Sequence, residues 1–171
     1  MHKHNRFLTT LIASIVIILL TSCATPTSQQ QANTAPTPPP RPTYAKRIIS
    51  ILNQQGKSTT ITAEIAASPE EHSYGLMYQT SLPENQGMMF LFNYPFRYAF
   101  WMKNTLIPLE MIFADKDKKI VDIIHAAPCK QDPCPNYEPK KEGMFVLEVN
   151  EGFSNKNSIS IGDEVVFGEN L

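Results

Sequence analysis

The sequence predicts an α+β domain, mainly antiparallel β, with a curled or barrel-like sheet and one or two short helices. Two observations support this class. Beyond residue 44, short apolar and β-branched runs are separated by polar turns along most of the chain. The clearest helix signals lie around residues 68–75, and that stretch is short. Strands in such excess over helices are typical of a sheet that curls on itself rather than of alternating strand–helix units.

The elements follow one another in a simple order. RIISIL and TTITAEI flank NQQGKS, which predicts an opening hairpin with Gly56 in its turn. Ser68 is a suitable helix N-cap and Glu71 stands three residues later, the spacing of a capping box, so we expect a short helix that ends near Gly75. The remaining predicted strands are Gly87–Phe92, Phe100–Asn104, Leu109–Ala114, Lys119–His125, Met144–Val149 and a last short one after Asp163.

Residues 1–22 have the features of a bacterial lipoprotein signal peptide. Two basic residues precede an apolar run that is short for a membrane-spanning helix. LTSC, which ends at Cys23, resembles a lipobox, and this resemblance implies cleavage before Cys23 and attachment of lipid to its thiol. The alternative is an N-terminal anchor that is never cleaved. Ala24 is not the aspartate of inner-membrane retention, so we expect the outer membrane, facing the periplasm, if the host has two membranes.

Residues 23–43 predict a tether and residues 44–171 a single globular domain. Beyond the lipidated cysteine the tether is rich in Pro, Thr and Gln and has no aromatic or acidic residue, so it cannot bury enough apolar surface to fold. All 16 acidic residues lie in the domain, against 12 Lys and Arg, and no basic cluster is present. This charge pattern argues against nucleic acid as a partner.

Cys129 and Cys134 are the two cysteines left once Cys23 carries lipid. In an oxidising compartment such a pair predicts a disulfide that closes a small loop. A redox-active pair or half of a metal site are the alternatives. Because the spacer is wider than in CxxC centres and no second cysteine pair exists, we favour the disulfide.

The stretch FWMKNTLIPLEMIF, residues 100–113, holds the only tryptophan. If Thr105–Pro108 forms a turn, an antiparallel hairpin around it pairs Lys103 with Glu110 and Trp101 with Ile112. One face is then an apolar set that belongs to the core, made of Phe100, Met102, Met111 and Phe113.

The second face of this expected hairpin has two interpretations. Trp101 can simply pack on Ile112 beside a cross-strand Lys103–Glu110 ion pair. Alternatively, an aromatic platform beside a fixed cation and carboxylate forms a ligand surface for a sugar or a small charged molecule.

Several segments occur in the order found in one known family. They are GLMY, GMMFLF, FWMKNT, IPLEMIF, the proline and cysteine of APC, and VLEVNEG. The chain therefore resembles the bacterial and archaeal family called domain of unknown function 192, with Gln79 and Glu110 where the family usually has a base and an aspartate. The resemblance implies a compact, often exported β-rich domain, brings no established reaction, and favours a ligand site around Trp101, Lys103, Asn104 and Glu110.

Other polar residues are weaker candidates. Tyr137 either reaches a nearby pocket or caps a core edge, and Glu148 in VLEVN is expected to be solvated on a strand face. His72 and His125 have no histidine at metal spacing, and the methionines fall in apolar runs, so we expect no metal and no cofactor.

Three hypotheses of function follow. The first is a lipid-anchored envelope module that binds a small polar ligand, a glycan or a partner protein through the Trp101–Glu110 face. The second is an envelope hydrolase that uses Lys103, Glu110 and Tyr137. The third is a structural module without a small-molecule site.

Overall fold

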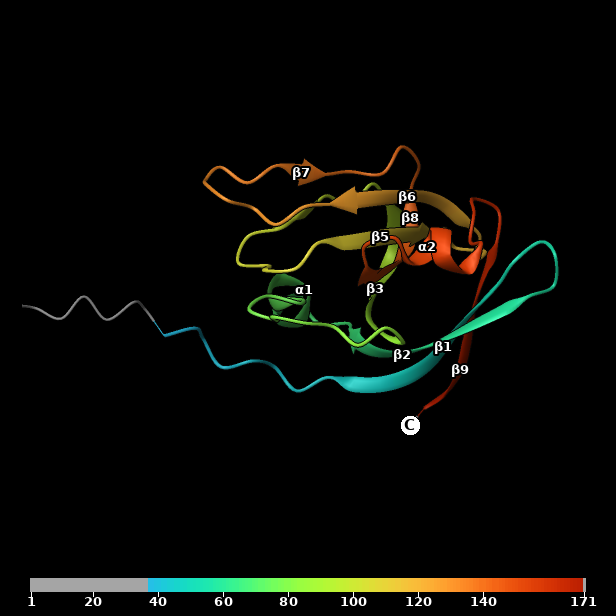
Figure 1. Ribbon diagram of the computed structural model, residues 1–171, viewed down its shortest axis with the longest axis horizontal. Helices are drawn as coiled ribbons and strands as arrows, with labels where there is room; N and C mark the ends of the chain where they lie inside the picture. Colours follow the sequence, from blue (N-terminus) through green and yellow to red (C-terminus); the bar gives the residue numbers. More distant parts are fainter. Residues whose placement is uncertain (1–36, 171) are drawn as a thin grey trace, which may run out of the picture. The chain divides into compact units, whose positions relative to one another are not determined.

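The computed structural model describes residues 37–170, which form a domain of nine strands and two short helices (Figure 1). The predicted signal peptide, Cys23 and the tether up to residue 36 lie outside the described residues. Between residues 37 and 170, neither helix is long or apolar enough to cross a membrane. The elements are β1 (Ala45–Leu52), β2 (Ser58–Ala66), α1 (Pro69–Tyr74), β3 (Gln86–Phe96), β4 (Phe100–Trp101), β5 (Leu109–Ala114), β6 (Ile120–Ala126), β7 (Asn136–Tyr137), β8 (Gly143–Asn150), α2 (Phe153–Asn157) and β9 (Glu164–Asn170).

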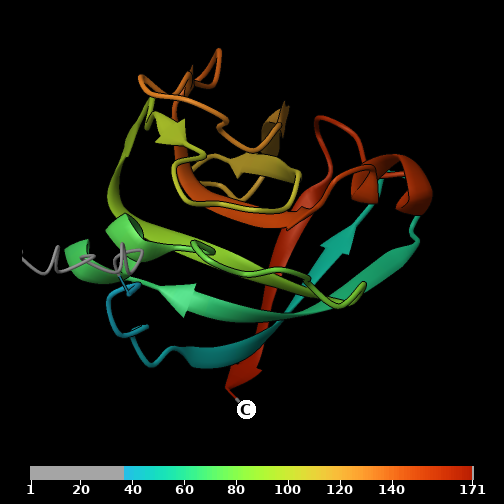
Figure 2. The ribbon, with the colours of Figure 1, turned by 60° about the vertical axis from the view of Figure 1, so that its left-hand side comes forward.

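Seven strands form one sheet in the order β6-β5-β8-β3-β2-β1-β9, and β4 pairs with β7 in a separate ribbon. Every neighbouring pair is antiparallel except β2–β3, which is parallel and is joined through α1. The sheet twists and curls until the turn before β6 approaches β9 (Figure 2), where Ile120 N–H donates to Asp163 O at 2.8 Å. The sheet does not close. The predicted class, α+β and mainly antiparallel β with a curled sheet, is confirmed.

Two apolar cores lie on the two sides of this sheet. The inner core, enclosed by the curl, contains residues from all seven strands, together with Phe153 of α2 and Ile159 just after it. The outer core lies against β3, β5 and β8 and is covered by Leu76, Tyr44 and the β4–β7 ribbon. Strands at the centre of the sheet are therefore buried on both faces, and all six residues of β5 are buried.

The local predictions for the first half of the domain are confirmed. Gly56 turns the β1–β2 hairpin with a left-handed φ of 81°. The Ser68 side chain accepts from Glu71 N–H, and the Glu71 carboxylate accepts from Ser68 N–H, which completes the capping box of α1. The backbone N–H groups of Ala67 and Ser68 both donate to the Glu71 carboxylate, and these two bonds lower the pKa of Glu71.

The predicted hairpin across residues 105–108 is wrong. Strand β4 stops at Trp101 and pairs with β7, whereas β5 pairs with β6 and β8. The chain turns after β4 because Thr105 N–H donates to Met102 O and Asn104 adopts a left-handed φ of 56°. With β6 and β8 on its two edges, β5 has no free edge for residues 100–104. Lys103 and Glu110 are therefore not cross-strand partners.

Candidate functional site

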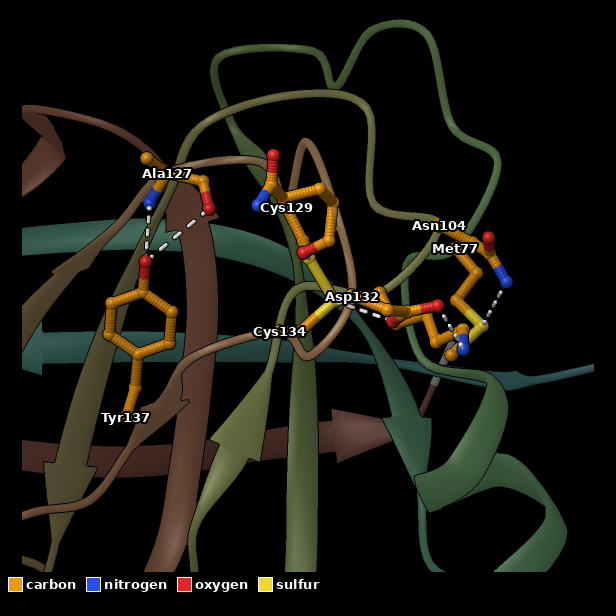
Figure 3. Close-up of a disulfide and its surroundings, with 9 residues drawn as sticks. Met77, Asn104, Ala127, Cys129, Asp132, Cys134 and Tyr137 are labelled. Carbon is orange, nitrogen blue, oxygen red and sulfur yellow. Dashed lines mark hydrogen bonds and ion pairs between the residues drawn. A yellow bond between two sulfur atoms is a disulfide. The ribbon is translucent and has the colours of Figure 1, made fainter.

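Lys103 and Asn104 lie beside the disulfide loop, which Figure 3 shows together with Asn104. Cys129 and Cys134 form the predicted disulfide. The Lys103 ammonium, which the hairpin model paired with Glu110, instead contacts the Asp132 carboxylate of this loop at 3.0 Å. Because both side chains of this pair are well exposed, it contributes little to stability.

Asn104 has a clear role in the local backbone. Its carbonyl accepts from Tyr78 N–H at 2.8 Å, and its amide nitrogen donates to the Tyr78 hydroxyl at 2.9 Å. Both residues have left-handed φ angles, 56° for Asn104 and 62° for Tyr78. Asparagine tolerates this conformation better than most residues, so Asn104 suits the turn that ends the β4 segment.

Glu110, the second residue of β5, is fully buried against the start of α2. Its Oε1 accepts from Ser154 N–H at 2.7 Å and from the Ser154 hydroxyl. Its Oε2 lies 3.4 Å from Nδ1 of His125, which also contacts Glu151 at 2.9 Å. Glu110 thus joins β5, β6 and α2, and the structure does not bring it together with Trp101, Lys103 or Asn104.

Tyr137 lies in the β7 strand, on the other side of the disulfide (Figure 3). Its hydroxyl accepts from Ala127 N–H at 3.2 Å and lies 3.4 Å from Ala127 O, while its ring packs against the outer core. The hydroxyl is therefore occupied by the backbone that follows β6.

Trp101 is half exposed and lines a different, small pocket on the outer face of the sheet. The pocket lies between the last turn of α1, the residues that follow it, and β4. Its walls include aromatic rings, a thioether and a hydroxyl, and its lining is His72, Ser73, Tyr74, Gly75, Leu76, Met77, Phe90, Phe100, Trp101, Thr105 and Glu148.

Glu148 is the acidic member of this lining, and only 5% of its surface is exposed. It lies on β8 between Met88 of β3 and Met111 of β5, both fully buried. Among residues 37–170 the structure records no hydrogen bond or ion pair to its carboxylate. Burial raises the pKa of Glu148 to about 8, with no compensating interaction.

Sequence reasoning placed Glu148 on a solvated strand face, and the structure shows that this expectation was wrong. Alternation correctly put Glu148 on the opposite face from Leu147 and Val149, which lie in the inner core. That other face is not solvated, because α1 and β4 cover it. Only the cover supplied by distant segments turns a polar strand position into a buried one.

The described residues contain one group of side chains at metal-binding distance, Cys129, Asp132 and Cys134. The two sulfurs are bonded to each other, so they offer no thiolate to a metal ion.

Fold and pocket together define a small β-rich domain with a buried carboxylate in a partly aromatic pocket. The chain belongs to the DUF192 family, described as "Uncharacterized ACR", whose model matches residues 50–167. The family resemblance drawn from the sequence motifs is thereby confirmed. A comparison with proteins of curated description gives no match.

Two solved structures are similar to this one. A protein of Sinorhizobium meliloti, provisionally described as a transcription regulator, is 30% identical with a TM-score of 0.68; the match covers 72% of this chain and 95% of that chain. A protein of unknown function from Novosphingobium aromaticivorans is 30% identical with a TM-score of 0.67, covering 78% and 94% respectively.

Proposed function

We propose that this protein is a cell-envelope lipoprotein whose domain is a binding module for a small polar ligand. The lipobox-like LTSC and the apolar run before it support lipid attachment at Cys23. The disulfide between Cys129 and Cys134 supports an oxidising compartment outside the cytoplasm. Membrane association then comes from the lipid, and the domain is free to bind a ligand.

The observation that carries the binding function is the Glu148 carboxylate, which is buried in a pocket whose wall includes Trp101 and has no hydrogen-bond or ion-pair partner among residues 37–170. An unpaired buried charge destabilises a fold unless it is neutralised or paired. Such groups are concentrated at functional sites. Of the site residues predicted from the sequence, the proposed site keeps Trp101. Its carboxylate is Glu148 and not Glu110, because Glu110 lies on the side of the inner core and accepts a hydrogen bond from Ser154.

The hydrolase alternative loses its main support. It needed Lys103 and Glu110 side by side, whereas Lys103 contacts Asp132 on the surface and Glu110 lies beneath α2. The Tyr137 hydroxyl forms its hydrogen bonds with the backbone of Ala127, and not with Lys103 or Glu110.

A ligand screen tests the binding function. The full chain, in a non-ionic detergent, is screened by thermal shift against envelope glycans, peptidoglycan fragments, nucleotides, amino acids and divalent metal ions. We expect one class to raise the melting temperature, with the effect lost in Trp101→Ala. It should survive in Lys103→Ala, because Lys103 lines the disulfide loop instead. If no compound shifts the melting temperature, the third hypothesis, a structural module, is favoured.

Lipid attachment has its own test. Cys23→Ser should abolish incorporation of labelled fatty acid in bacterial cells and leave the precursor uncleaved. Unchanged labelling and processing would show that the N-terminal segment is not a lipoprotein signal.

A further inference from the structure

We propose that the pocket beside α1 binds the primary ammonium group of a small organic ligand, with the Glu148 carboxylate as its counter-charge and Trp101 at its side. This inference rests on the proposed binding function and specifies the chemistry of the ligand.

The charge of the pocket favours a cationic ligand. Among residues 37–170, its lining contains one carboxylate, Glu148, and neither lysine nor arginine. In this same part of the chain, His72 supplies the one ionisable nitrogen of the lining, and its Nε2–H donates to Ala66 O at 3.0 Å. The Lys103 ammonium lies 5.8 Å from the centroid of the Trp101 ring, but it contacts Asp132 and does not line the pocket. Within the described residues no cationic side chain forms an ion pair with Glu148, so an anionic ligand is disfavoured and a cationic one is favoured.

The walls of the pocket also suit an ammonium group. Phe90, Phe100 and Trp101 offer ring faces or edges, and a cation beside such rings is stabilised by the electron-rich ring face. The Thr105 side chain is buried in the same lining, and the structure records no hydrogen bond to its hydroxyl within residues 37–170. A primary ammonium group has three donors, and Glu148 and Thr105 offer oxygen acceptors.

The size of the pocket limits the ligand group that can enter it. The cavity volume is about 30 Å³, enough for a group of one or two heavy atoms and too small for a sugar ring. Metal ions fit poorly as well, because Ca²⁺ requires six to eight oxygen ligands and most of this lining is apolar. A primary ammonium group on a slender alkyl stem satisfies size, charge and donor number together.

Binding should depend on pH in a defined direction. The raised pKa of Glu148, about 8, means that its carboxyl group must lose a proton before it pairs with an ammonium ion. The other titratable groups that face it are His72 and Tyr74 on α1, while β3, β4 and β5 present no ionisable side chain to the pocket. Ammonium affinity should therefore rise about tenfold for each pH unit up to about pH 7 and level off above about pH 8.

The test uses three probes of equal chain length: n-butylammonium, 1-butanol and butyrate. Trp101 is the only tryptophan of the chain, so its indole N–H gives one NMR signal that reports on the pocket directly. The full chain in non-ionic detergent is titrated with each probe at pH 7.5. We expect saturable shifts with butylammonium, with an affinity about tenfold or more above that of 1-butanol, and no binding of butyrate. A fourth probe, Nα-acetyl-lysine amide, carries the ammonium group on a lysine side chain. Comparing its affinity with that of n-butylammonium shows whether the pocket accepts a lysine side chain or only a small free amine.

Glu148→Gln is the decisive variant, because it keeps shape and removes the charge. It should reduce butylammonium affinity about tenfold or more and leave the weak 1-butanol response unchanged. Glu142→Gln, an exposed glutamate just before β8, is the matched control and should bind as the wild type does. If 1-butanol or butyrate binds as tightly as n-butylammonium or more tightly, the ammonium inference is wrong, although the pocket is still a binding site. If no probe binds while the broader screen finds a ligand, the inference fails alone; if nothing binds in either experiment, the proposed function fails as well.

Discussion

Replacing Glu148 by glutamine removes a charge from the covered face of β8 while the size of the side chain stays the same. Burial raises the pKa of this group from its ordinary value of 4.5 to about 8. From pH 4.5 upward the unfolded chain has released this proton, whereas the folded domain keeps it until about pH 8. The wild-type protein therefore loses stability across this window as the pH rises, and it loses nothing from this group below pH 4.5.

The magnitude follows from about 1.4 kcal/mol for each pH unit in the window. Going from pH 4.5 to above pH 8 costs the wild-type domain about 5 kcal/mol, of which about 3 kcal/mol is lost by pH 7. Because Glu148→Gln does not titrate, its stability relative to the wild type should rise by these amounts. For a domain of this size, 3 kcal/mol corresponds to a difference in melting temperature of about 10 °C.

The assay is thermal unfolding of both proteins, followed by circular dichroism at intervals between pH 4.5 and 8.5, with Glu142→Gln as the control. The gap between Glu148→Gln and the wild type should widen steadily with pH, and the control should show no such trend. A gap that stays constant over this range would mean that Glu148 titrates normally, and the interpretation of a buried, unpaired carboxyl group would be wrong.

Three further substitutions test the fold around the site. Gly87→Ala should destabilise the domain by about 2–4 kcal/mol in urea unfolding, because an added Cβ would lie 2.5 Å from the Glu148 carbonyl oxygen on β8; a cost below about 0.5 kcal/mol would argue against this packing of β3 on β8. Tyr137→Phe should cost about 1 kcal/mol through its lost contact with Ala127 and leave butylammonium affinity unchanged; weakened binding in the NMR titration would place Tyr137 in the site after all. Glu110→Ala should cost about 3 kcal/mol, because it leaves a buried N–H of α2 without an acceptor and opens a cavity, and an unchanged denaturation midpoint would contradict that role.

Local signals predicted much of the fold. The capping box at Ser68, the turn at Gly56 and the strand periodicity depend on residues close together in the sequence, and each is confirmed. The disulfide between Cys129 and Cys134 was also predictable, because these two cysteines lie close together in the sequence. These features follow from propensity and hydrogen bonding within a few residues.

The candidate site required information that no short window contains. The hairpin prediction paired Lys103 with Glu110 because it assumed that adjacent strands pair, whereas β5 takes β8 as a neighbour from more than 30 residues away in the chain. Because β5 pairs with β8, Lys103 lies at the disulfide loop and Glu110 lies against α2, and β8 is buried on both faces. Glu148 is covered by α1 and β4, and the residues around VLEVN contain no signal that predicts either contact.

The most direct test of the pocket is to titrate the Glu148 carboxyl carbon by ¹³C NMR in the full chain, with and without n-butylammonium. We predict an apparent pKa near 8 without the amine and a lower value in its presence, because the bound ammonium stabilises the carboxylate. A pKa near 4.5 without the amine would contradict the burial of an unpaired carboxyl group, and a raised pKa that the amine leaves unchanged would contradict its role as the counter-charge.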